Sequence, residues 1–345
     1  MVMITALTVA LDDIGEIAAA SGTRDVLDGE AICTVERFAL TANNVTYAAH
    51  GADMGYWRFF PAPAGRGIVP VWGFAEVLES RADGLKPGTR LFGYWPMASH
   101  AVLMPGVVNV RGFDDMAPHR QGLAPVYNRY VPASADWGEE ALQCLFRPLY
   151  ATSFVLDAML QKSPADVLLL SSASSKTAMG LAQLARGRQR VVGLTSHANR
   201  AFCAATGYYD DVLDYDSIDE VAGNRVAFID FAGNGDVRLA VHQHLGERLI
   251  ESHIVGDTHW QVPGLNRLPG VQPQLFFAPS IIAERVAEWG ASGYDARLLA
   301  AWRRFAGSLS WLELAEAEGP RMVARQWRAL AAGQIDPRLG MTFRL

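Results

Sequence analysis

The pattern of hydrophobic and polar residues changes once along the chain, near residue 139. Before that point, short runs of β-branched and aromatic residues alternate with turns that contain Gly and Pro. Ile68–Trp72, Arg90–Tyr94 and His100–Leu103 are such runs, and Lys86-Pro87-Gly88 is such a turn. This spacing is typical of an all-β domain or a small barrel.

After residue 139, the pattern predicts strands that alternate with helices. Glu140–Leu160 has helical spacing, and the continuous apolar run Ala165–Leu170 is typical of a buried strand. Alternation of this kind over roughly 100 residues indicates a parallel, doubly wound sheet. The further predicted strands are residues 190–194, 211–215, 226–230 and 248–251, and the helices between them are 177–186, 199–205 and 237–245.

The two ends of the chain add fewer elements. Residues 280–289, 296–305 and 318–332 have helical patterns, and an extended segment follows at 340–345. Residues 1–13 are apolar without basic residues, so we expect a first strand rather than a signal peptide. No apolar run approaches the length of a membrane span. We therefore expect a cytoplasmic protein without a membrane partner.

Composition and charge narrow the class of protein. The chain has 345 residues, which at about 150 residues per domain suggests two domains. Half of the residues are hydrophobic, 50%, which excludes global disorder. The formal net charge is −6 and no run of Lys and Arg occurs, so we expect no nucleic-acid partner.

Several segments carry a more specific pattern. Val167–Ala185 and Val191–Ala204 resemble the first two strand–helix units of the medium-chain dehydrogenase/reductases, in their zinc-free, quinone-oxidoreductase-like branch. Leu85–Leu91 is similar to a conserved turn of that family. Thr41–Tyr47 and Pro70–Phe74 resemble a bacterial subgroup catalogued only as a domain of unknown function.

The resemblance implies an α/β fold with two domains. Residues 1–138 would form a GroES-like, β-barrel-type catalytic domain, completed in part by roughly 270–345. Residues 139–270 would form a doubly wound Rossmann domain with a parallel sheet. The resemblance also implies a homodimer.

The predicted phosphate loop departs from the family pattern. Ser172, Ser175, Lys176 and Ala178 occupy the usual glycine positions, and only Gly180 remains. Small residues still permit close approach of a phosphate to the helix N-terminus. The alternative is an ordinary Ser/Thr helix cap with Lys176 in solvent. We predict phosphate contact from Ser174, Ser175, Lys176 and Thr177, and the resemblance adds Phe231 and Gly256 as cofactor-binding positions.

The end of the second predicted strand indicates which coenzyme binds. NAD sites place an acidic residue there to bind the ribose, but Gly193–His197 contains none. Arg200 follows one helical turn later, and a 2′-phosphate favours guanidinium and hydroxyl donors such as Arg200 and Ser196. The resemblance places Tyr215 near the same phosphate. We therefore predict NADP(H), the alternative being that Arg200 is a solvated surface residue.

Metal ligands are not arranged in a recognisable spacing. Cys33, Cys144 and Cys203 lie far apart, and His50 has no Cys near it in the sequence. His242 and His244 diverge on a helix. Zinc sites need three or four such ligands, so we expect no metal site.

Without zinc, neutral donors must polarise a substrate carbonyl. Tyr56, Tyr47 and Asn44 are the candidates, and the resemblance favours a tyrosine near position 56. The alternative is that the aromatic rings simply fill the core. We predict NADPH-dependent reduction of a small apolar carbonyl, enone or quinone in the inter-domain cleft. A non-redox NADP(H)-binding sensor or interaction protein, and a lyase using the same cleft, are the alternatives.

Overall fold

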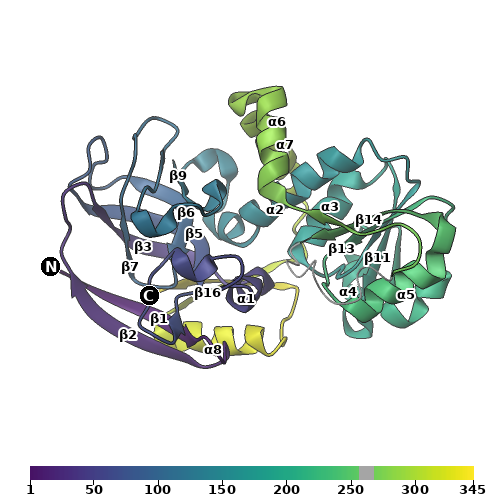
Figure 1. Cartoon of the computed structure of the whole chain (residues 1–345), viewed down its shortest axis with the longest axis horizontal. Helices are drawn as coiled ribbons and strands as arrows, with labels where there is room; N and C mark the ends of the chain where they lie inside the picture. Colours follow the sequence, from purple (N-terminus) through teal and green to yellow (C-terminus); the bar gives the residue numbers. More distant parts are fainter. Residues whose placement is uncertain (256–267) are drawn as a thin grey trace. The chain divides into compact units, whose positions relative to one another are not determined.

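The chain forms two compact units, coloured along the sequence in Figure 1. The structure is a computed structural model that describes residues 1–255 and 268–345. Unit 1 contains Met1–Pro148 and Leu312–Leu345, and unit 2 contains Leu149–Trp311. The sequence-based division was at residue 139 and near residue 270. The first boundary lies later because helix α2, Glu140–Leu160, begins in one unit and ends in the other.

Unit 1 is built on two mainly antiparallel sheets, as the alternation of short strands and turns predicts. A three-stranded sheet has the order β2-β1-β4, and an eight-stranded sheet has the order β16-β17-β3-β5-β6-β9-β8, with β7 on β3. The strands are β1 Val2–Ala10, β2 Ile17–Arg24, β3 Ala31–Ala39, β4 Arg66–Gly67, β5 Pro70–Ser80, β6 Arg90–Pro96, β7 His100–Leu103, β8 Phe113–Asp114, β9 Arg129–Pro132, β16 Glu313–Glu318 and β17 Leu339–Arg344.

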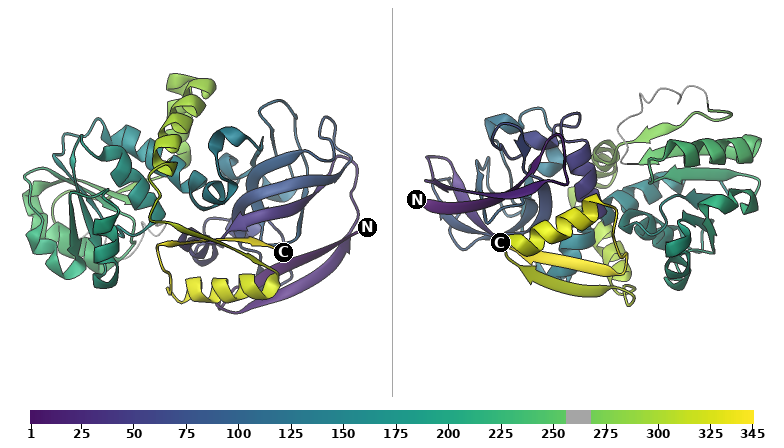
Figure 2. Two further views of the ribbon diagram at one scale, coloured as in Figure 1. Left: turned by 180° about the vertical axis from the view of Figure 1, so that it is seen from behind. Right: turned by 90° about the horizontal axis from the view of Figure 1, so that it is seen from below.

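The end of the chain returns to unit 1. Strand β17 pairs with β3 in antiparallel register, with Phe343 opposite Phe38. Helix α8, Pro320–Ala331, lies along the β1–β2 hairpin in the views of Figures 1 and 2. The indole N–H of Trp327 on α8 donates to the Ile14 carbonyl at 2.6 Å. The terminal segment therefore completes unit 1.

Unit 2 contains one parallel sheet in the order β12-β11-β10-β13-β14-β15. The chain starts at β10, steps outward to β12, and then continues from β13 on the other side. This is the strand order of a dinucleotide-binding fold, so the predicted fold class is confirmed. The strands are β10 Val167–Leu170, β11 Arg190–Thr195, β12 Asp211–Asp214, β13 Val226–Asp230, β14 Leu249–Val255 and β15 Gln274–Phe276; the helices are α3 Lys176–Ala185, α4 His197–Ala205, α5 Gly235–Leu245, α6 Ala278–Trp289 and α7 Ala291–Ala306.

The core of this sheet explains why its strands are so apolar. Val167, Leu169, Val192, Leu194 and Phe228 are fully buried in one cluster, as strands covered on both faces require. Within the described part of the chain, no helix combines the length and the hydrophobicity that crossing a bilayer needs.

Gly180 allows two helices of unit 2 to approach closely. A Cβ atom at this position would lie 2.7 Å from Ser153 Oγ and 3.1 Å from the Tyr150 ring on α2. The Ser153 hydroxyl also donates to the Thr177 carbonyl on α3 at 2.7 Å. The one glycine that remains of the family's loop pattern is therefore required by helix packing.

Candidate functional site

Parallel strands place four loops at one edge of the sheet in unit 2. Strands β10, β11, β12 and β13 pair side by side, so their carboxyl ends meet at that edge. The predicted cofactor residues follow directly: Ser174 after β10, Ser196 after β11, Tyr215 after β12 and Phe231 after β13. Gly256, which was also predicted to bind cofactor, lies outside the described residues.

The loop after β10 keeps the backbone shape that glycine usually provides. Ser172 has a φ of 49°, the one positive φ of a non-glycine residue in the described ranges. A left-handed conformation at such a residue costs about 1–2 kcal/mol. The Ser172 N–H donates to the Tyr215 hydroxyl at 3.0 Å, and the Tyr209 hydroxyl donates to the Ala173 carbonyl at 2.6 Å. These contacts hold the loop in place.

The N-terminus of α3 combines a helix cap with a cation. The Ser175 hydroxyl accepts a hydrogen bond from the Ala178 N–H at 3.3 Å, as the alternative interpretation of this segment expects. Lys176 is nevertheless half-buried rather than solvated, and burial lowers the pKa of its ammonium to about 8. Lys176 and Thr177, the first residues of α3, thus bring a titratable positive charge to the helix N-terminus.

The N-terminus of α4 is joined to the same loop. Ser196 is the N-cap residue of α4, and the Asn199 side-chain amide donates to the Ser174 hydroxyl at 3.2 Å. Arg200 lies in the first turn of α4, where its guanidinium pairs with Asp214 at 3.4 Å. The hydrogen bond between Asn199 and Ser174 brings the loop after β10 next to the start of α4, so Ser174, Ser196 and Arg200 lie in one region.

Asp214 changes the interpretation of this region. No acid ends β11, as the sequence predicts, but Asp214 ends β12 directly opposite Thr195 in the register. Its carboxylate lies 3.2 Å from His197 Nδ1 as well as 3.4 Å from Arg200. The sequence analysis missed Asp214 because it considered only the strand that precedes Arg200, whereas neighbouring strands of a parallel sheet end together.

A buried polar cluster connects the loops after β10 and β13. The Asp230 carboxylate pairs with Arg238 at 2.8 Å, and both side chains are buried. The Ser171 hydroxyl donates to Asp230 at 2.8 Å and accepts from the Phe231 N–H at 2.9 Å. Asp230 also accepts from the Gly233 N–H at 3.2 Å. The backbone of Phe231 is therefore fixed by this cluster. The sequence analysis did not single out its members Ser171, Asp230 and Arg238.

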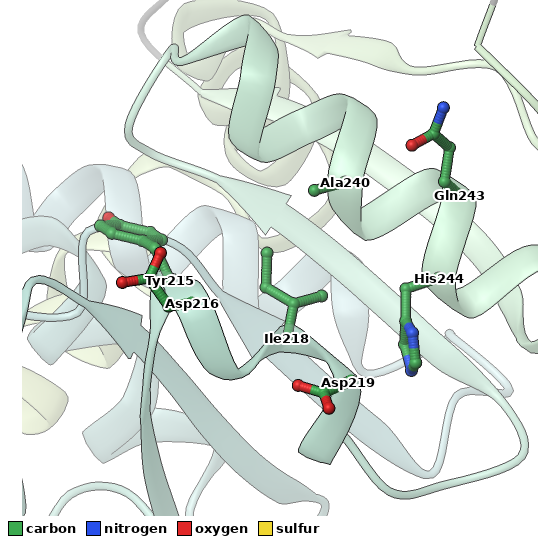
Figure 3. Close-up of a pocket in the computed structure, with 7 residues that line it drawn as sticks. All are labelled: Tyr215, Asp216, Ile218, Asp219, Ala240, Gln243 and His244. Atoms are coloured by element: carbon green, nitrogen blue, oxygen red, sulfur yellow. The ribbon is translucent and has the colours of Figure 1, made fainter.

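A shallow, open depression of about 440 Å³ adjoins this edge (Figure 3). Tyr215 lies at one end of it and His244 at the other. Besides Tyr215, its lining comes from the 3-10 helix after β12 and from α5: Asp216, Ile218, Asp219, Ala240, Gln243 and His244.

Unit 1 gathers the predicted catalytic tyrosines in an aromatic cluster. Tyr47 on α1, Ala42–Ala49, and Tyr56 on a 3-10 turn have ring centroids 4.7 Å apart. Tyr127, which the sequence analysis missed, lies 5.7 Å from Tyr56 and 4.7 Å from Tyr94. Trp72 packs against Tyr94 at 5.0 Å. We define the aromatic cluster as Tyr47, Tyr56, Phe59, Phe60, Trp72, Tyr94 and Tyr127.

The hydroxyls of the aromatic cluster are neutral hydrogen-bonding groups. Burial raises the pKa of Tyr47 and Tyr56 above the ordinary value of 10, so both remain protonated at neutral pH. The Tyr47 hydroxyl accepts from the Trp72 indole at 3.2 Å, and the Tyr56 and Tyr127 hydroxyls lie 3.4 Å apart. Protonated phenols can donate to an oxygen that gains charge.

Asn44 has its polar atoms engaged within the fold. Its side-chain oxygen accepts from the Thr41 N–H at 2.7 Å, and its amide donates to the Pro70 carbonyl at 2.9 Å. The side chain is buried. Asn44 thus fixes the start of α1, the helix that carries Tyr47, and joins it to β5.

A buried ion pair packs against the aromatic cluster. Asp115 and Arg120 are fully buried, with Nε and Oδ2 3.1 Å apart. The Arg120 guanidinium lies 4.7 Å from the Phe60 ring centroid and donates to the Tyr130 hydroxyl at 3.1 Å. The Tyr130 hydroxyl in turn donates to the backbone carbonyl of Tyr94 at 2.5 Å.

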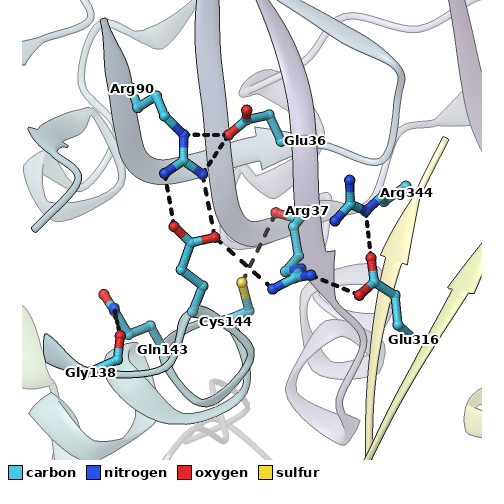
Figure 4. Close-up of polar contacts among 9 residues, drawn as sticks. Glu36, Arg37, Arg90, Gly138, Gln143, Cys144, Glu316 and Arg344 are labelled. Atoms are coloured by element: carbon cyan, nitrogen blue, oxygen red, sulfur yellow. Dashed lines mark hydrogen bonds and ion pairs between the residues drawn. The ribbon is translucent and has the colours of Figure 1, made fainter. Parts of the chain in front are cut away.

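Ion pairs within unit 1 connect β3 and β6 to the start of α2 and to the C-terminal strands (Figure 4). Arg90 on β6 bonds to Glu36 at 2.9 Å and to Glu140 at 2.9 Å. Arg37 on β3 bonds to Glu316 on β16 at 2.7 Å, and Glu316 also pairs with Arg344 on β17. These groups are partly exposed, so each pair is worth little alone, and we assign them a structural role.

The described residues contain no group of three or more His, Cys, Asp or Glu side chains placed to hold a metal ion. Cys33, Cys144 and Cys203 are buried separately. Burial raises the pKa of Cys33 to about 12 and that of Cys203 to about 11, so these thiols stay protonated and are poor ligands.

Solved structures of oxidoreductases share the fold of this chain at low sequence identity. The structure of CurA in complex with NADPH from Vibrio vulnificus is 14% identical, with a TM-score of 0.62 over 99% of this chain and 98% of that one. The mitochondrial 2-enoyl thioester reductase heterodimer of Candida tropicalis is 10% identical, with a TM-score of 0.63 over 100% of both chains. The yhdH oxidoreductase of Salmonella enterica in complex with NADP is 12% identical, with a TM-score of 0.57 over 99% of both.

Sequence comparison gives the family within that fold. A family model described as "Protein of unknown function (DUF2855)" matches residues 38–336, and the chain belongs to this family. No protein of curated function matches the sequence. The resemblance to a subgroup catalogued as a domain of unknown function is thereby confirmed, and the similar oxidoreductase structures confirm the predicted fold.

Proposed function

We propose that the protein is an NADPH-dependent, zinc-independent oxidoreductase that reduces a small, apolar carbonyl compound, enone or quinone. The observation that carries the proposal is that Lys176 and Arg200 stand at the N-termini of α3 and α4, at the carboxyl edge of the sheet. Two helix N-termini and two cations favour a phosphate-containing ligand. The names of the similar structures, which include NADPH and NADP, support the same coenzyme.

The residues of the loop fit a dinucleotide phosphate in shape and in charge. Ser172 keeps the left-handed backbone of a glycine at the first turn of the loop. Ser174 and Thr177 offer hydroxyl donors, and Lys176 and Arg200 offer positive charge. When bound, the coenzyme would supply the hydride. The chain's own groups would bind and orient it.

Tyr56 and Tyr47 would act on the substrate. A neutral, buried phenol can donate a hydrogen bond to a carbonyl oxygen and stabilise the negative charge that grows there during reduction. Asn44 would position α1, and with it Tyr47, rather than contact substrate, because its amide is already engaged with Thr41 and Pro70.

Coenzyme titration followed by a substrate panel tests the proposal. The fluorescence of reduced nicotinamide should report tighter binding of NADPH than of NADH. A panel of enones, quinones and apolar aldehydes should contain at least one compound that accelerates loss of NADPH absorbance. Tyr56→Phe should slow that turnover about 100-fold and leave NADPH affinity unchanged, because the donor acts only as charge develops. Equal rates would assign the role to Tyr47.

A non-redox NADP(H)-binding protein is the second candidate, and one observation favours it. The N–H groups of Ser172, Ala173 and Ser175 already donate within the fold, to the Tyr215 hydroxyl and to the carbonyls of Leu194 and Ser172. A loop with fewer free N–H groups contributes less to phosphate binding. Tight NADPH binding without oxidation by any compound of the panel would favour this candidate, and any sustained oxidation would reject it.

A further inference from the structure

The hydroxyl of Tyr94 is a polar group buried among aromatic rings. Tyr94 lies on β6, its side chain is 0% exposed, and its ring packs against Phe59, Trp72 and Tyr127. Within the described residues, no group forms a hydrogen bond with its hydroxyl oxygen. An unpaired buried hydroxyl is unfavourable, and phenylalanine would fill the same space without that cost.

The neighbouring tyrosine hydroxyls form hydrogen bonds, whereas the Tyr94 hydroxyl forms none in the part of the chain that the structure describes. The Tyr47 hydroxyl accepts from Trp72, and the Tyr130 hydroxyl bonds to Arg120 and to the Tyr94 carbonyl. The backbone of Tyr94 is therefore held firmly while its hydroxyl has no partner. A polar group kept in this way indicates a role outside the stability of the fold.

The surroundings of this hydroxyl indicate what it could bind. The hydroxyls of Tyr47, Tyr56 and Tyr127 and the guanidinium of Arg120 lie near enough to act on it electrostatically. Asp115 neutralises Arg120 within the same buried pair. Donors surrounded by aromatic faces and without net charge favour a flat, neutral ligand that offers an oxygen acceptor.

We propose that Tyr94 donates a hydrogen bond to the carbonyl oxygen of a flat, conjugated ketone or quinone that binds within the aromatic cluster. Because Tyr94 has no exposed surface, ligand binding would require the partly exposed ring of Tyr127 to move aside. Tyr127 ends a three-residue 3-10 turn, Pro125–Tyr127, which is not part of either sheet. The inference names the substrate class and rests on the proposed function for the identity of the reacting carbonyl group.

Binding without coenzyme tests the inference separately from turnover. Acetonaphthone, a flat aryl ketone, and ethylnaphthalene, the matching hydrocarbon, are titrated into wild type and Tyr94→Phe by calorimetry. The variant should bind the ketone about tenfold more weakly and the hydrocarbon equally well, because only the ketone uses the hydroxyl. Thermal unfolding is measured on the same two proteins and on Tyr130→Phe, whose hydroxyl is paired.

The expected thermal result has opposite signs for the two variants. Tyr94→Phe should raise the melting temperature by about 2–4 °C, and Tyr130→Phe should lower it by a similar amount. Equal ketone affinity in wild type and Tyr94→Phe, or no ketone binding, would overturn the inference. A lower melting temperature for Tyr94→Phe would also overturn it, because the hydroxyl would then have a partner in the resting protein. Ketone binding without NADPH oxidation would contradict only the proposed function.

Discussion

Among the described residues, each unit contains a buried aspartate–arginine pair, and the two pairs contact different parts of their unit. In unit 1, Asp115 and Arg120 lie behind the aromatic cluster, and the guanidinium faces aromatic rings. In unit 2, Asp230 and Arg238 lie between two loops, and the carboxylate also binds Ser171. Both carboxylates also accept from backbone N–H groups, Asp115 from Met104 and Ala117 and Asp230 from Ala232 and Gly233. The difference is that the first pair faces aromatic rings, whereas the second joins two loops of unit 2.

The difference matches the role that we propose for each region. Phosphate groups are bound largely by backbone N–H groups and helix N-termini, so unit 2 needs its loops fixed in conformation. A flat apolar ligand is bound by ring faces, so unit 1 needs its rings fixed in orientation. A buried pair is poor evidence for stability in itself but strongly resists the removal of one partner.

Removing either aspartate should have the largest effect on stability. Asp230→Ala and Asp115→Ala each leave a buried arginine without its counter-charge, which costs about 3–5 kcal/mol. Both carboxylates accept two backbone N–H bonds. Asp230→Ala should cost slightly more, because the Asp230 carboxylate also accepts from the Ser171 hydroxyl. Denaturant unfolding measures the loss, and hydrogen exchange assigns it to unit 2 or unit 1.

An exposed aspartate provides the control. Asp28 is 99% exposed, and Asp28→Ala should change the free energy of unfolding by less than about 0.5 kcal/mol. If the loss in Asp115→Ala spread equally to exchange in both units, the two pairs would not act locally, and the comparison between them would fail.

The sequence predicts elements that depend on local pattern. The α2 helix, Glu140–Leu160, has the predicted bounds, and the strand at His100–Leu103 does also. Strand β16 was missed, and a helix was expected from residue 318. Glu313–Glu318 consists of Glu, Leu and Ala, which favour helix locally. It becomes a strand because β17 pairs with it and Arg37 binds its Glu316.

The candidate site likewise contains residues that local sequence pattern predicts and residues whose roles depend on contacts between distant segments. Residues that directly follow a predicted strand, such as Ser174 and Tyr215, reach the expected edge because a parallel sheet determines where they go. Asp214 and Arg238 were missed because their roles depend on contacts across strands and between loops. Tyr127 lies in a segment without periodic pattern, so no local signal indicates that it packs against Tyr56 and Tyr94.

A substitution at Gly180 tests how closely α2 and α3 pack in unit 2. Gly180→Ala places a Cβ atom 2.7 Å from Ser153 Oγ, so α3 must shift, and overpacking of this kind costs about 1–3 kcal/mol. Gly235→Ala is the matched control, since nothing lies within 4 Å of its added Cβ atom. Thermal unfolding should separate the two variants. Equal stability would mean that the α2–α3 contact can relax without loss.

Lys176 should make coenzyme affinity depend on pH. Burial lowers the pKa of Lys176 from 10.5 to about 8, so the ammonium is charged below pH 8 and neutral above it. NADPH affinity should fall about tenfold as pH rises through 8, because one charge-assisted contact is lost. Lys176→Met should bind NADPH with an affinity that does not change across this range, as measured by fluorescence titration.

The same shift predicts the opposite trend for stability. Between about pH 8 and 10.5 the unfolded chain binds more protons at this lysine than the folded chain does. The free energy of unfolding from this group therefore rises with pH across that window. The affinity prediction has its own contradicting outcome: identical pH profiles of NADPH affinity in wild type and Lys176→Met would show that Lys176 does not contact the coenzyme.

Arg200 should give the smallest effect and tests coenzyme choice most directly. Its side chain is 46% exposed and shares its charge with Asp214 at 3.4 Å, so its contribution is about 0.5–1 kcal/mol. Arg200→Ala should weaken NADPH binding about two- to fivefold and leave NADH binding unchanged, because only NADPH carries the 2′-phosphate. Asp214→Asn should strengthen NADPH, since it removes a nearby negative charge and releases the guanidinium. Titration of both coenzymes against the three proteins measures this. If Arg200→Ala weakened NADH as much as NADPH, the guanidinium would not distinguish the ribose phosphate, and the choice of NADPH would need another residue of unit 2.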